Sequence, residues 1–189
     1  KEMGLPGLKY EVAQLIKNKY EVRKCLYENH VDDTEQAYEV HEDTNIEELA
    51  RKIVYPVMVK PCDGSGSRGA SRVDRAEDLK EACEYAIAGS ITNRAEIETF
   101  ITGREYGAES LVINGEVHVL GVMQKWMTKP PYYAELGHSI PSDLKTEVEE
   151  KVKKCVTNAI KALGVNFGSV NMDMLITEDG KVYIIDIGA

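Results

Sequence analysis

The feature that most constrains the fold is a glycine-rich segment between two short apolar stretches, YPVMVKPCDGSGSRGASRV (55–73). Its GSGSRG core satisfies G-x-G-x-x-G, a pattern found in dinucleotide-binding loops and protein-kinase lids. A dinucleotide-binding loop opens directly into a helix, whereas ASRV has the pattern of a second strand. The sequence also lacks the kinase triplets H-R-D and D-F-G and the G-K-[ST] ending of a Walker A loop. The segment therefore predicts a strand, a glycine loop and a returning strand.

Such a loop suits a lid over the outer phosphates of a nucleotide. Successive glycine N–H groups can surround phosphate oxygens because no Cβ is in the way. Arg68 adds positive charge within the loop, and Lys60 ends the preceding strand, where a rigid backbone would hold it toward a phosphate. The alternative is a plain glycine hairpin with Lys60 in solvent. The loop residues expected to contact phosphate are Gly64, Ser65, Gly66, Ser67 and Gly69.

The end of the chain predicts a hairpin, SVNMDMLIT–EDGK–VYIIDIG (169–188). A two-residue Asp179-Gly180 turn would set Asp173 directly opposite Asp186. Like charges that face each other across two strands are destabilising, and in a mostly buried sheet they need a partner. A Mg²⁺ ion that also binds phosphates would provide one. The alternative is a bulge that moves one aspartate off the face. The count assigns Leu175, Val182 and Ile184 to the face of the aspartates, and Met172, Met174, Ile176, Tyr183, Ile185 and Ile187 to the other face.

The remaining periodicity predicts a mixed α+β chain with antiparallel hairpins. Helices are expected over 11–29, 46–53, 75–88 and 144–163. The last three are expected to be capped at their starts, by Thr44 or Asn45, by an Asp74–Glu77 capping box and by Ser142 respectively. Strands are expected within 31–40 and over 56–60, 70–73, 96–101, 105–113 and 116–123, with the last two joined by an Asn114-Gly115 turn. Residues 125–141 are expected to form an aromatic and proline-rich loop.

Composition excludes several classes of function. The net charge is −9, and Lys and Arg are scattered, which argues against nucleic acid or an anionic membrane as the main partner. No apolar run approaches the roughly 18 residues of a membrane span, and no leader is evident, so a cytoplasmic protein is expected. The four cysteines lack C-x-x-C spacing, which favours free thiols over disulfides or zinc. Because the chain opens at Lys1, an upstream segment is expected.

Taken together, these features resemble the ATP-grasp superfamily, which includes D-alanine–D-alanine ligase, biotin carboxylase and the carbamoyl-phosphate synthetase large subunit. The resemblance covers about Asn18 to Ala189. It implies an α+β ATP-grasp fold, in which two α+β lobes with antiparallel sheets grip ATP between them. Residues 1–17 would be a linker from a missing N-terminal domain, 18–94 the first lobe with its lid, and 95–189 the second lobe, truncated at its C-terminus, with the metal-binding hairpin.

The resemblance also implies roles for individual residues. Lys19 in NKYEVRKCL and Lys60 would touch phosphates and, with Arg68, act in catalysis. The segment EIETFITGRE resembles an adenine-binding hinge, in which Glu98 would accept from the adenine amino group and Glu105 would bind the ribose. For these two acids, ordinary surface positions are the alternative. The further positions implied to bind the nucleotide or its metal are Thr99, Phe100, Ile101, His138 in GHSIPS (for which capping or packing is the alternative), Asp173 and Asp186, with Lys125 as an additional phosphate or substrate contact.

One departure concerns the last strand, which in the family reads acid-x-Asn-x-Arg. Gly188 stands at the Asn position, and the chain stops before the Arg. The expectation is therefore a fragment, or the ordered core, of a larger ligase in which one ligand of the family is lost or replaced.

The function implied is ATP-dependent carboxylate–amine ligation through an acylphosphate, with ATP and Mg²⁺ (or Mn²⁺) as cofactors. The partners would be a small carboxylate and an amine nucleophile, with no nucleic acid and no membrane. One alternative is activation of bicarbonate, as in biotin carboxylase and carbamoyl-phosphate synthetase. A second is an ATP-binding module without catalysis. The acid, the nucleophile and the oligomeric state stay open.

Overall fold

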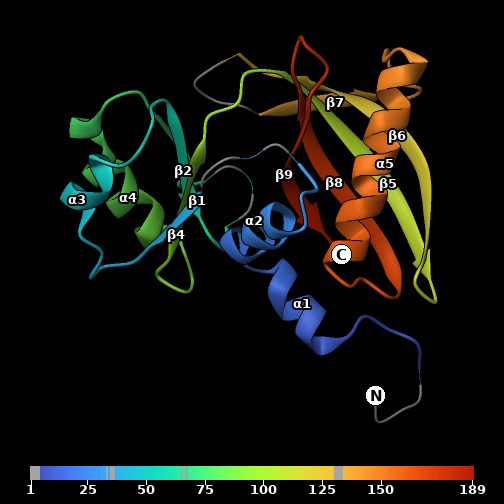
Figure 1. Cartoon of the computed structure of the whole chain (residues 1–189), viewed down its shortest axis with the longest axis horizontal. Helices are drawn as coiled ribbons and strands as arrows, with labels where there is room; N and C mark the ends of the chain where they lie inside the picture. Colours follow the sequence, from blue (N-terminus) through green and yellow to red (C-terminus); the bar gives the residue numbers. More distant parts are fainter. Residues whose placement is uncertain (1–4, 33, 35–36, 65, 67, 130–133) are drawn as a thin grey trace. The chain divides into compact units, whose positions relative to one another are not determined.

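The computed structural model describes residues 5–32, 34, 37–64, 66, 68–129 and 134–189. The chain divides into two compact units, each built on one antiparallel sheet. We call them the four-stranded unit (Lys17–Lys24 and Thr34–Phe100) and the five-stranded unit (Lys1–Ile16, Cys25–Asp33 and Ile101–Ala189). Antiparallel sheets with flanking helices confirm the predicted α+β class (Figure 1). Within the described residues, no helix is both long and apolar enough to cross a membrane.

The four-stranded unit has the strand order β1-β4-β2-β3. Its strands are β1 (Ala37–Val40), β2 (Val57–Pro61), β3 (Ser71–Val73) and β4 (Ala95–Thr99). The helices α3 (Ile46–Ala50) and α4 (Leu79–Ala88), with a 3-10 turn at Ala76–Asp78, accompany the sheet (Figure 1). Alternation along β2 sends Val57 and Val59 into the core that α4 completes. Lys60 therefore points to the opposite face of the sheet.

The five-stranded unit has the strand order β7-β6-β5-β8-β9. Its strands are β5 (Arg104–Ile113), β6 (Glu116–Met127), β7 (Glu135–Ser139), β8 (Gly168–Ile176) and β9 (Val182–Gly188). The long helix α5 (Thr146–Ala162) lies along the sheet (Figure 1) and buries the apolar stripe Val152, Val156 and Ile160. The predicted Asn114-Gly115 turn is confirmed, since Ile113 pairs with Glu116 around it.

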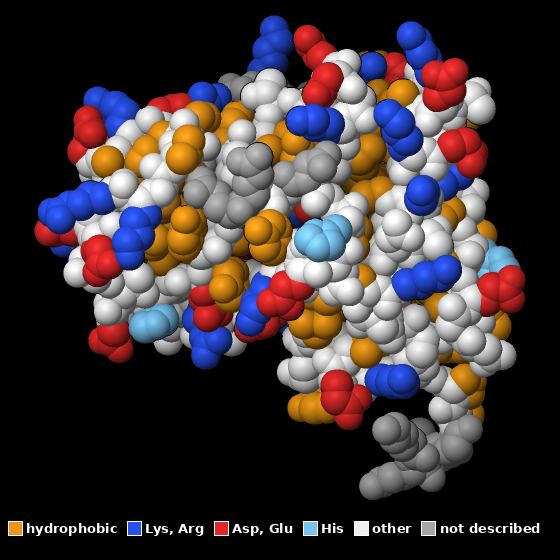
Figure 2. Space-filling view, viewed as in Figure 1, with side chains coloured by type: hydrophobic (Ala, Val, Ile, Leu, Met, Phe, Trp, Pro, Cys, Tyr) orange, Lys and Arg blue, Asp and Glu red, His pale blue; other side chains and the backbone are white. Residues whose placement is uncertain are grey.

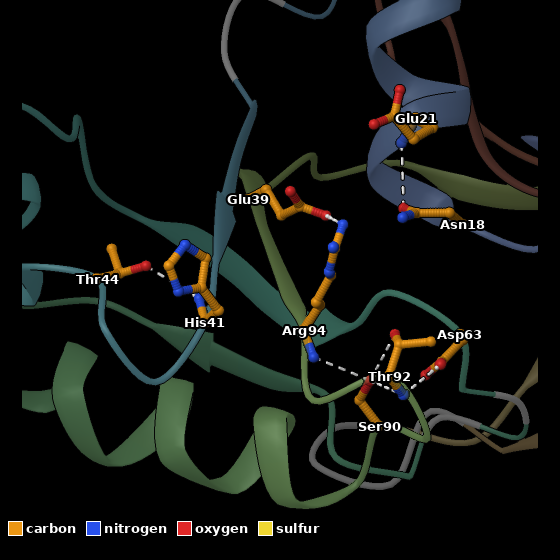
Figure 3. A network of polar contacts seen from close by, with 9 residues as sticks. All are labelled: Asn18, Glu21, Glu39, His41, Thr44, Asp63, Ser90, Thr92 and Arg94. Carbon is orange, nitrogen blue, oxygen red and sulfur yellow. Dashed lines mark hydrogen bonds and ion pairs between the residues drawn. The ribbon is translucent and has the colours of Figure 1, made fainter.

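Three of the predicted helices are divided or begin differently in the structure. The helix expected over 11–29 is two helices, α1 (Tyr10–Ile16) and α2 (Lys19–Glu28), and Asn18 Oδ1 accepts the Glu21 N–H at the start of α2 (Figure 3). The Asp74 capping box is wrong, because Arg72 binds that carboxylate and a 3-10 turn precedes α4. Ser142 does not cap α5, which begins at Thr146 after Lys145. The Asn45 cap of α3 is confirmed by its bond from the Glu48 N–H.

The loop predicted over 125–141 is wrong in part. Lys125–Met127 continue β6, and Glu135–Ser139 form β7, so that Lys125 pairs with His138. The two prolines at 130 and 131, which suggested a loop throughout, lie outside the described residues. Strand β7 shows no clear apolar alternation, because it is a largely exposed edge strand.

The β8–β9 hairpin reaches the predicted facing pair by a different route. The turn has three residues, because the Thr177 N–H bonds to the Lys181 carbonyl. A one-residue turn shift would place Asp186 opposite Met172, but a bulge absorbs Ile185 and restores the pair Asp173↔Asp186. Near the turn the predicted faces are therefore wrong. Val182 and Ile184 pair with the buried Ile176 and Met174, and Tyr183 pairs with Leu175 on the other face.

The structure groups residues differently from the expected division into 1–17, 18–94 and 95–189. Strand β4 pairs with β1 and β2, so it belongs to the four-stranded unit, which continues to Phe100. Residues 10–16 form α1, whose Val12 is buried in the five-stranded unit. The segment expected to be a linker thus contains a helix that packs within a unit.

Candidate functional site

The four-stranded unit holds a buried cluster of opposite charges around Lys60. Lys60 Nζ lies 2.6 Å from Glu98 Oε1 and 3.7 Å from Glu96 Oε2, and both carboxylates come from the central strand β4. Arg23, from α2, approaches Glu98 Oε2 at 3.2 Å and donates to Thr34. Strand register explains the grouping, because Lys60 pairs directly with Glu96. The cluster is therefore fixed by sheet geometry.

The two carboxylates of this cluster have opposite pKa shifts. Burial raises the pKa of Glu96 to about 7, and neither of its oxygens accepts a hydrogen bond from a described residue. Burial acts the same way on Glu98, but the charges of Lys60 and Arg23 outweigh it and lower the pKa of Glu98. Burial also opposes the charge of Lys60, yet Glu98 and Glu96 raise its pKa overall. Lys60 is therefore a fully charged ammonium at neutral pH.

The glycine loop between β2 and β3, residues 63–69, is attached to this unit at its first residue. The Asp63 carboxylate accepts the backbone N–H groups of Ile91 and Thr92 at 3.1 and 2.8 Å. Figure 3 shows the contact with Thr92. At the other end Gly69 packs against Pro61, where a Cβ would come within 2.7 Å of the ring, and its φ of 77° favours glycine. Arg68 and Gly66 are exposed. The segment is therefore anchored at both ends, while the predicted contacts Ser65 and Ser67 lie outside the described residues.

Lys19 lies at the start of α2, where its backbone N–H donates to the Cys62 carbonyl at 2.7 Å. That bond ties the helix to the residue that follows β2. The positive charge of Lys19 also helps to lower the pKa of Glu98, and it partly opposes the burial that raises the pKa of Glu96. Lys19 and Lys60 thus both act electrostatically on Glu96 and Glu98. Their contact with phosphate stays a prediction.

A second charged cluster, in the five-stranded unit, surrounds Lys125. Its Nζ lies 2.7 Å from Asp173, 3.0 Å from Glu105 and 3.0 Å from Glu135. Burial disfavours its charge, but the hydrogen bonds to these carboxylates outweigh that effect and raise the pKa of Lys125. The Nε2 of His138 lies 3.2 Å from the other Glu135 oxygen. Strands β5, β7 and β8 thus bring three carboxylates together around one lysine on β6.

Asp173 and Asp186 face each other across β8 and β9. The Asp173 side chain is 30% exposed, and Asp186 is exposed, so the buried setting predicted for them is wrong. Their chemistry still fits a hard divalent cation: Mg²⁺ takes one or two carboxylates and completes its shell with phosphate oxygens and water. The described residues contain no group of three His, Cys, Asp or Glu side chains able to hold a metal alone. The two aspartates suit a metal delivered with a phosphate ligand.

The remaining predicted residues lie near the junction of β4 and β5. Thr99 ends β4, the Phe100 N–H donates to the Pro56 carbonyl, and the Phe100 ring packs under the Arg72 guanidinium at 4.4 Å. Ile101 is the first residue of the five-stranded unit that follows. Sequence reasoning missed Arg23, Glu96 and Glu135. Only the alternation E-x-E at 96–98, opposite a strand that contains a lysine, could have indicated the first cluster.

The face of the molecule shown in Figure 2 carries both signs of charge. On the face shown in Figure 2, Lys and Arg side chains are interspersed with Asp and Glu. The mixture agrees with the net charge of −9 and the scattered basic residues of the sequence.

Comparison with known proteins identifies the class. Residues 53–189 match the family model described as an ATP-grasp domain, and the chain therefore belongs to the ATP-grasp family. Among curated relatives, the D-alanine–D-alanine ligase of Streptococcus mutans is 29% identical over 160 residues, which cover 77% of this chain and 42% of the relative. The corresponding ligase of Acetivibrio thermocellus is 30% identical over 151 residues, covering 75% of this chain and 39% of the relative.

Solved structures extend the similarity to the whole chain. The L-amino acid ligase from Bacillus licheniformis has a TM-score of 0.81 at 32% identity and covers 100% of this chain and 44% of that protein. A biotin carboxylase from Campylobacter jejuni, in complex with β,γ-ATP, has a TM-score of 0.81 at 21% identity over 96% of this chain and 42% of its own, and supports the fold alone. The chain has the ATP-grasp fold, and it spans less than half the length of each of these four proteins.

Proposed function

We propose that this chain binds ATP together with Mg²⁺ and forms the ATP-binding part of a ligase that joins a carboxylate to an amine. The observation that carries the proposal is the whole-chain match to the L-amino acid ligase from Bacillus licheniformis at 32% identity. The D-alanine–D-alanine ligases among the sequence relatives support the same class of reaction, because their name describes the joining of two amino acids.

The proposed reaction consists of two displacements. A carboxylate oxygen of the acid attacks the γ-phosphorus of ATP, and the bond from that phosphorus to the bridging oxygen breaks. ADP departs as the leaving group, and the acid has become an acylphosphate. An amine nitrogen then attacks the acyl carbon, the bond to the phosphate oxygen breaks, and the nitrogen releases a proton to solvent. The protein has to position the reactants and neutralise charge, without a nucleophilic side chain.

The two charged clusters supply what this chemistry requires. Lys60 is held on β2 as a buried ammonium, and we assign it, with Lys19 and the exposed Arg68, to the phosphate oxygens of ATP. Asp173 and Asp186 would hold Mg²⁺, which when bound would neutralise negative charge on the outer phosphates. The adenine and ribose roles of Glu98, of the backbone at 99–101 and of Glu105, and the nucleotide contact of His138, stay predictions.

The proposal is tested by calorimetric titration of the chain with a non-hydrolysable ATP analogue, with and without Mg²⁺. Asp186→Asn is the informative variant, because Asp186 is exposed and asparagine has nearly the same shape without the charge. Glu178→Gln, in the turn of the same hairpin, is the matched control. We expect Mg²⁺-dependent binding that falls at least tenfold in Asp186→Asn, about 1.4 kcal/mol, and is unchanged in the control. Absence of nucleotide binding by the wild type would refute the proposal.

Lys60→Ala is a weaker first probe. Removal of the Lys60 ammonium would leave Glu96 and Glu98 with one cation fewer in a buried cluster. The protein would then lose stability as well as a phosphate-binding group. Once binding is established, ADP release should be measured with amino acids and with bicarbonate. Stimulation by amino acids supports the ligase. Stimulation by bicarbonate alone would favour the carboxylase-like alternative, and no stimulation by either would favour a binding module.

A further inference from the structure

Gly188 and Asn171 are direct partners at the end of the β8–β9 hairpin. The three atoms nearest to a Cβ built on Gly188 all belong to the Asn171 side chain: it would collide with Oδ1, and would lie 3.3 Å from Cγ and 3.7 Å from Nδ2. Gly188 is not among the glycines with left-handed φ, so backbone conformation does not require a glycine there. The space that a side chain at position 188 would use is therefore taken by the amide of Asn171.

The same register places this amide beside the facing aspartates. Asn171 and Asp173 are two residues apart on β8, and their partners Gly188 and Asp186 are two apart on β9. Residues i and i+2 of a strand share a face and lie about 7 Å apart, and cross-strand partners lie about 5 Å apart. Three side chains with oxygen donors, Asn171, Asp173 and Asp186, consequently occupy one small area, and the Asn171 amide leans across onto the strand that carries Asp186.

We propose that Asn171 supplies its amide oxygen as a third protein ligand to the divalent cation held by Asp173 and Asp186, and that Gly188 is glycine to leave room for it. This inference rests on the proposed function, because that function supplies the cation together with ATP. Amide oxygens are hard, neutral donors that suit Mg²⁺ and Mn²⁺. The position of the ligand is thus set by two residues on opposite strands.

Charge balance favours a neutral third donor at this place. The two aspartates already face each other, and an arriving nucleotide brings further negative charge. Another carboxylate would add repulsion, whereas an amide adds a ligand without charge. Asp173 also gives one oxygen to Lys125 at 2.7 Å, which reduces what it can offer a metal. The neutral Asn171 oxygen, which lies beside Gly188 of β9, compensates for the Asp173 oxygen that is engaged by Lys125.

The test measures Mn²⁺ binding by electron paramagnetic resonance, in the presence of a non-hydrolysable ATP analogue, on the full 189-residue chain. Asn171→Ala removes the oxygen, and Asn171→Asp keeps one. The double variant Asn171→Ala with Gly188→Asn moves the amide to the partner strand, into the space that the alanine vacates. Ser169→Ala, two residues away on the same face of β8, is the matched control. Circular dichroism and thermal unfolding verify that each variant is folded.

We expect Asn171→Ala to weaken Mn²⁺ binding about tenfold or more, a loss typical of disturbed metal shells. Asn171→Asp keeps an oxygen but adds a charge beside the two aspartates, so its affinity should fall between those of the wild type and Asn171→Ala. The double variant should recover most of the loss, and the control should be unchanged. If the wild type binds Mn²⁺ and nucleotide, and Asn171→Ala binds them equally well, the inference is wrong while the proposed function stands. If the wild type binds neither, both are wrong.

Discussion

At the scale of single residues, Glu96 has the setting least compatible with its own charge. It is completely buried on the central strand of its sheet, faces Glu39 and Lys60 as register partners, and has no hydrogen bond from a described residue. Its nearest cation, Lys60, makes a much shorter contact to Glu98. Burial therefore prevails for Glu96 and raises its pKa to about 7, while Glu98 beside it has a lowered pKa.

This difference predicts a pH dependence of folding. Because the pKa of Glu96 is raised from 4.5 to about 7, the native state holds this proton more tightly than the unfolded chain does. The resulting stabilisation is present below about pH 4.5 and is lost as the pH rises through about 7. Glu98 acts in the opposite sense, in a window below 4.5, because its pKa is lowered. The two effects are therefore separated in pH.

Glu96→Gln should remove the Glu96 contribution. Between pH 5 and pH 8, the free energy of unfolding of the wild type should fall relative to that of the variant, by an amount on the order of 2 kcal/mol. Urea unfolding at several pH values measures the difference. Glu84→Gln, an exposed acid of the same unit, should follow the wild type. Parallel profiles for wild type and Glu96→Gln would show that Glu96 titrates normally.

At the scale of elements, the β8–β9 hairpin shows what sequence counting can and cannot give. Counting from Asp179-Gly180 predicted the facing aspartates correctly, although the turn has three residues and a bulge at Ile185. The faces near the turn were wrong because the core of the unit selects them. In the observed register Val182 and Ile184 are buried, and a regular two-residue turn would move both to the other face. Local turn signals do not contain that information.

The register predicts unequal effects of two neighbouring substitutions. Ile184 is 1% exposed, whereas Ile185 lies in the bulge and is only half-buried. Ile184→Ala should therefore lower the free energy of unfolding by about 2–4 kcal/mol, and Ile185→Ala by roughly 1 kcal/mol or less. Urea unfolding of both variants tests this. The reverse order of the two losses would indicate the regular hairpin that the turn sequence suggested.

At the scale of the whole molecule, the sequence predicted the α+β class and the ATP-grasp family, because several loose motifs occur in a consistent order. It was less informative about grouping. Strand β4 was expected to start the second lobe, since nothing local to residues 95–99 shows that its partners are β1 and β2. The Lys125 cluster was likewise beyond reach, because its members come from four strands whose order only the folded sheet reveals.

Buried thiols provide a test of the division into two units. Cys83 lies in the four-stranded unit and Cys155 in the five-stranded unit, and both are buried. Burial also raises the pKa of Cys83 to about 12, so labelling requires local opening. Ile184→Ala should accelerate labelling of Cys155 by a thiol reagent at least tenfold and leave Cys83 within about twofold, as measured by mass spectrometry. Equal acceleration at both would mean that the chain opens as one cooperative unit.

The bulge at Ile185 has a consequence for how the hairpin tolerates error. The residues between Asp173 and Asp186 can close either with a two-residue turn and regular strands, or with a three-residue turn and one bulged residue. The opposed carboxylates face each other in both arrangements. A change of register near the turn therefore alters which side chains are buried in the core, but Asp173 and Asp186 stay opposite each other. Substitutions that change the turn at the tip of this hairpin can consequently leave the pairing of the two aspartates at its base unchanged.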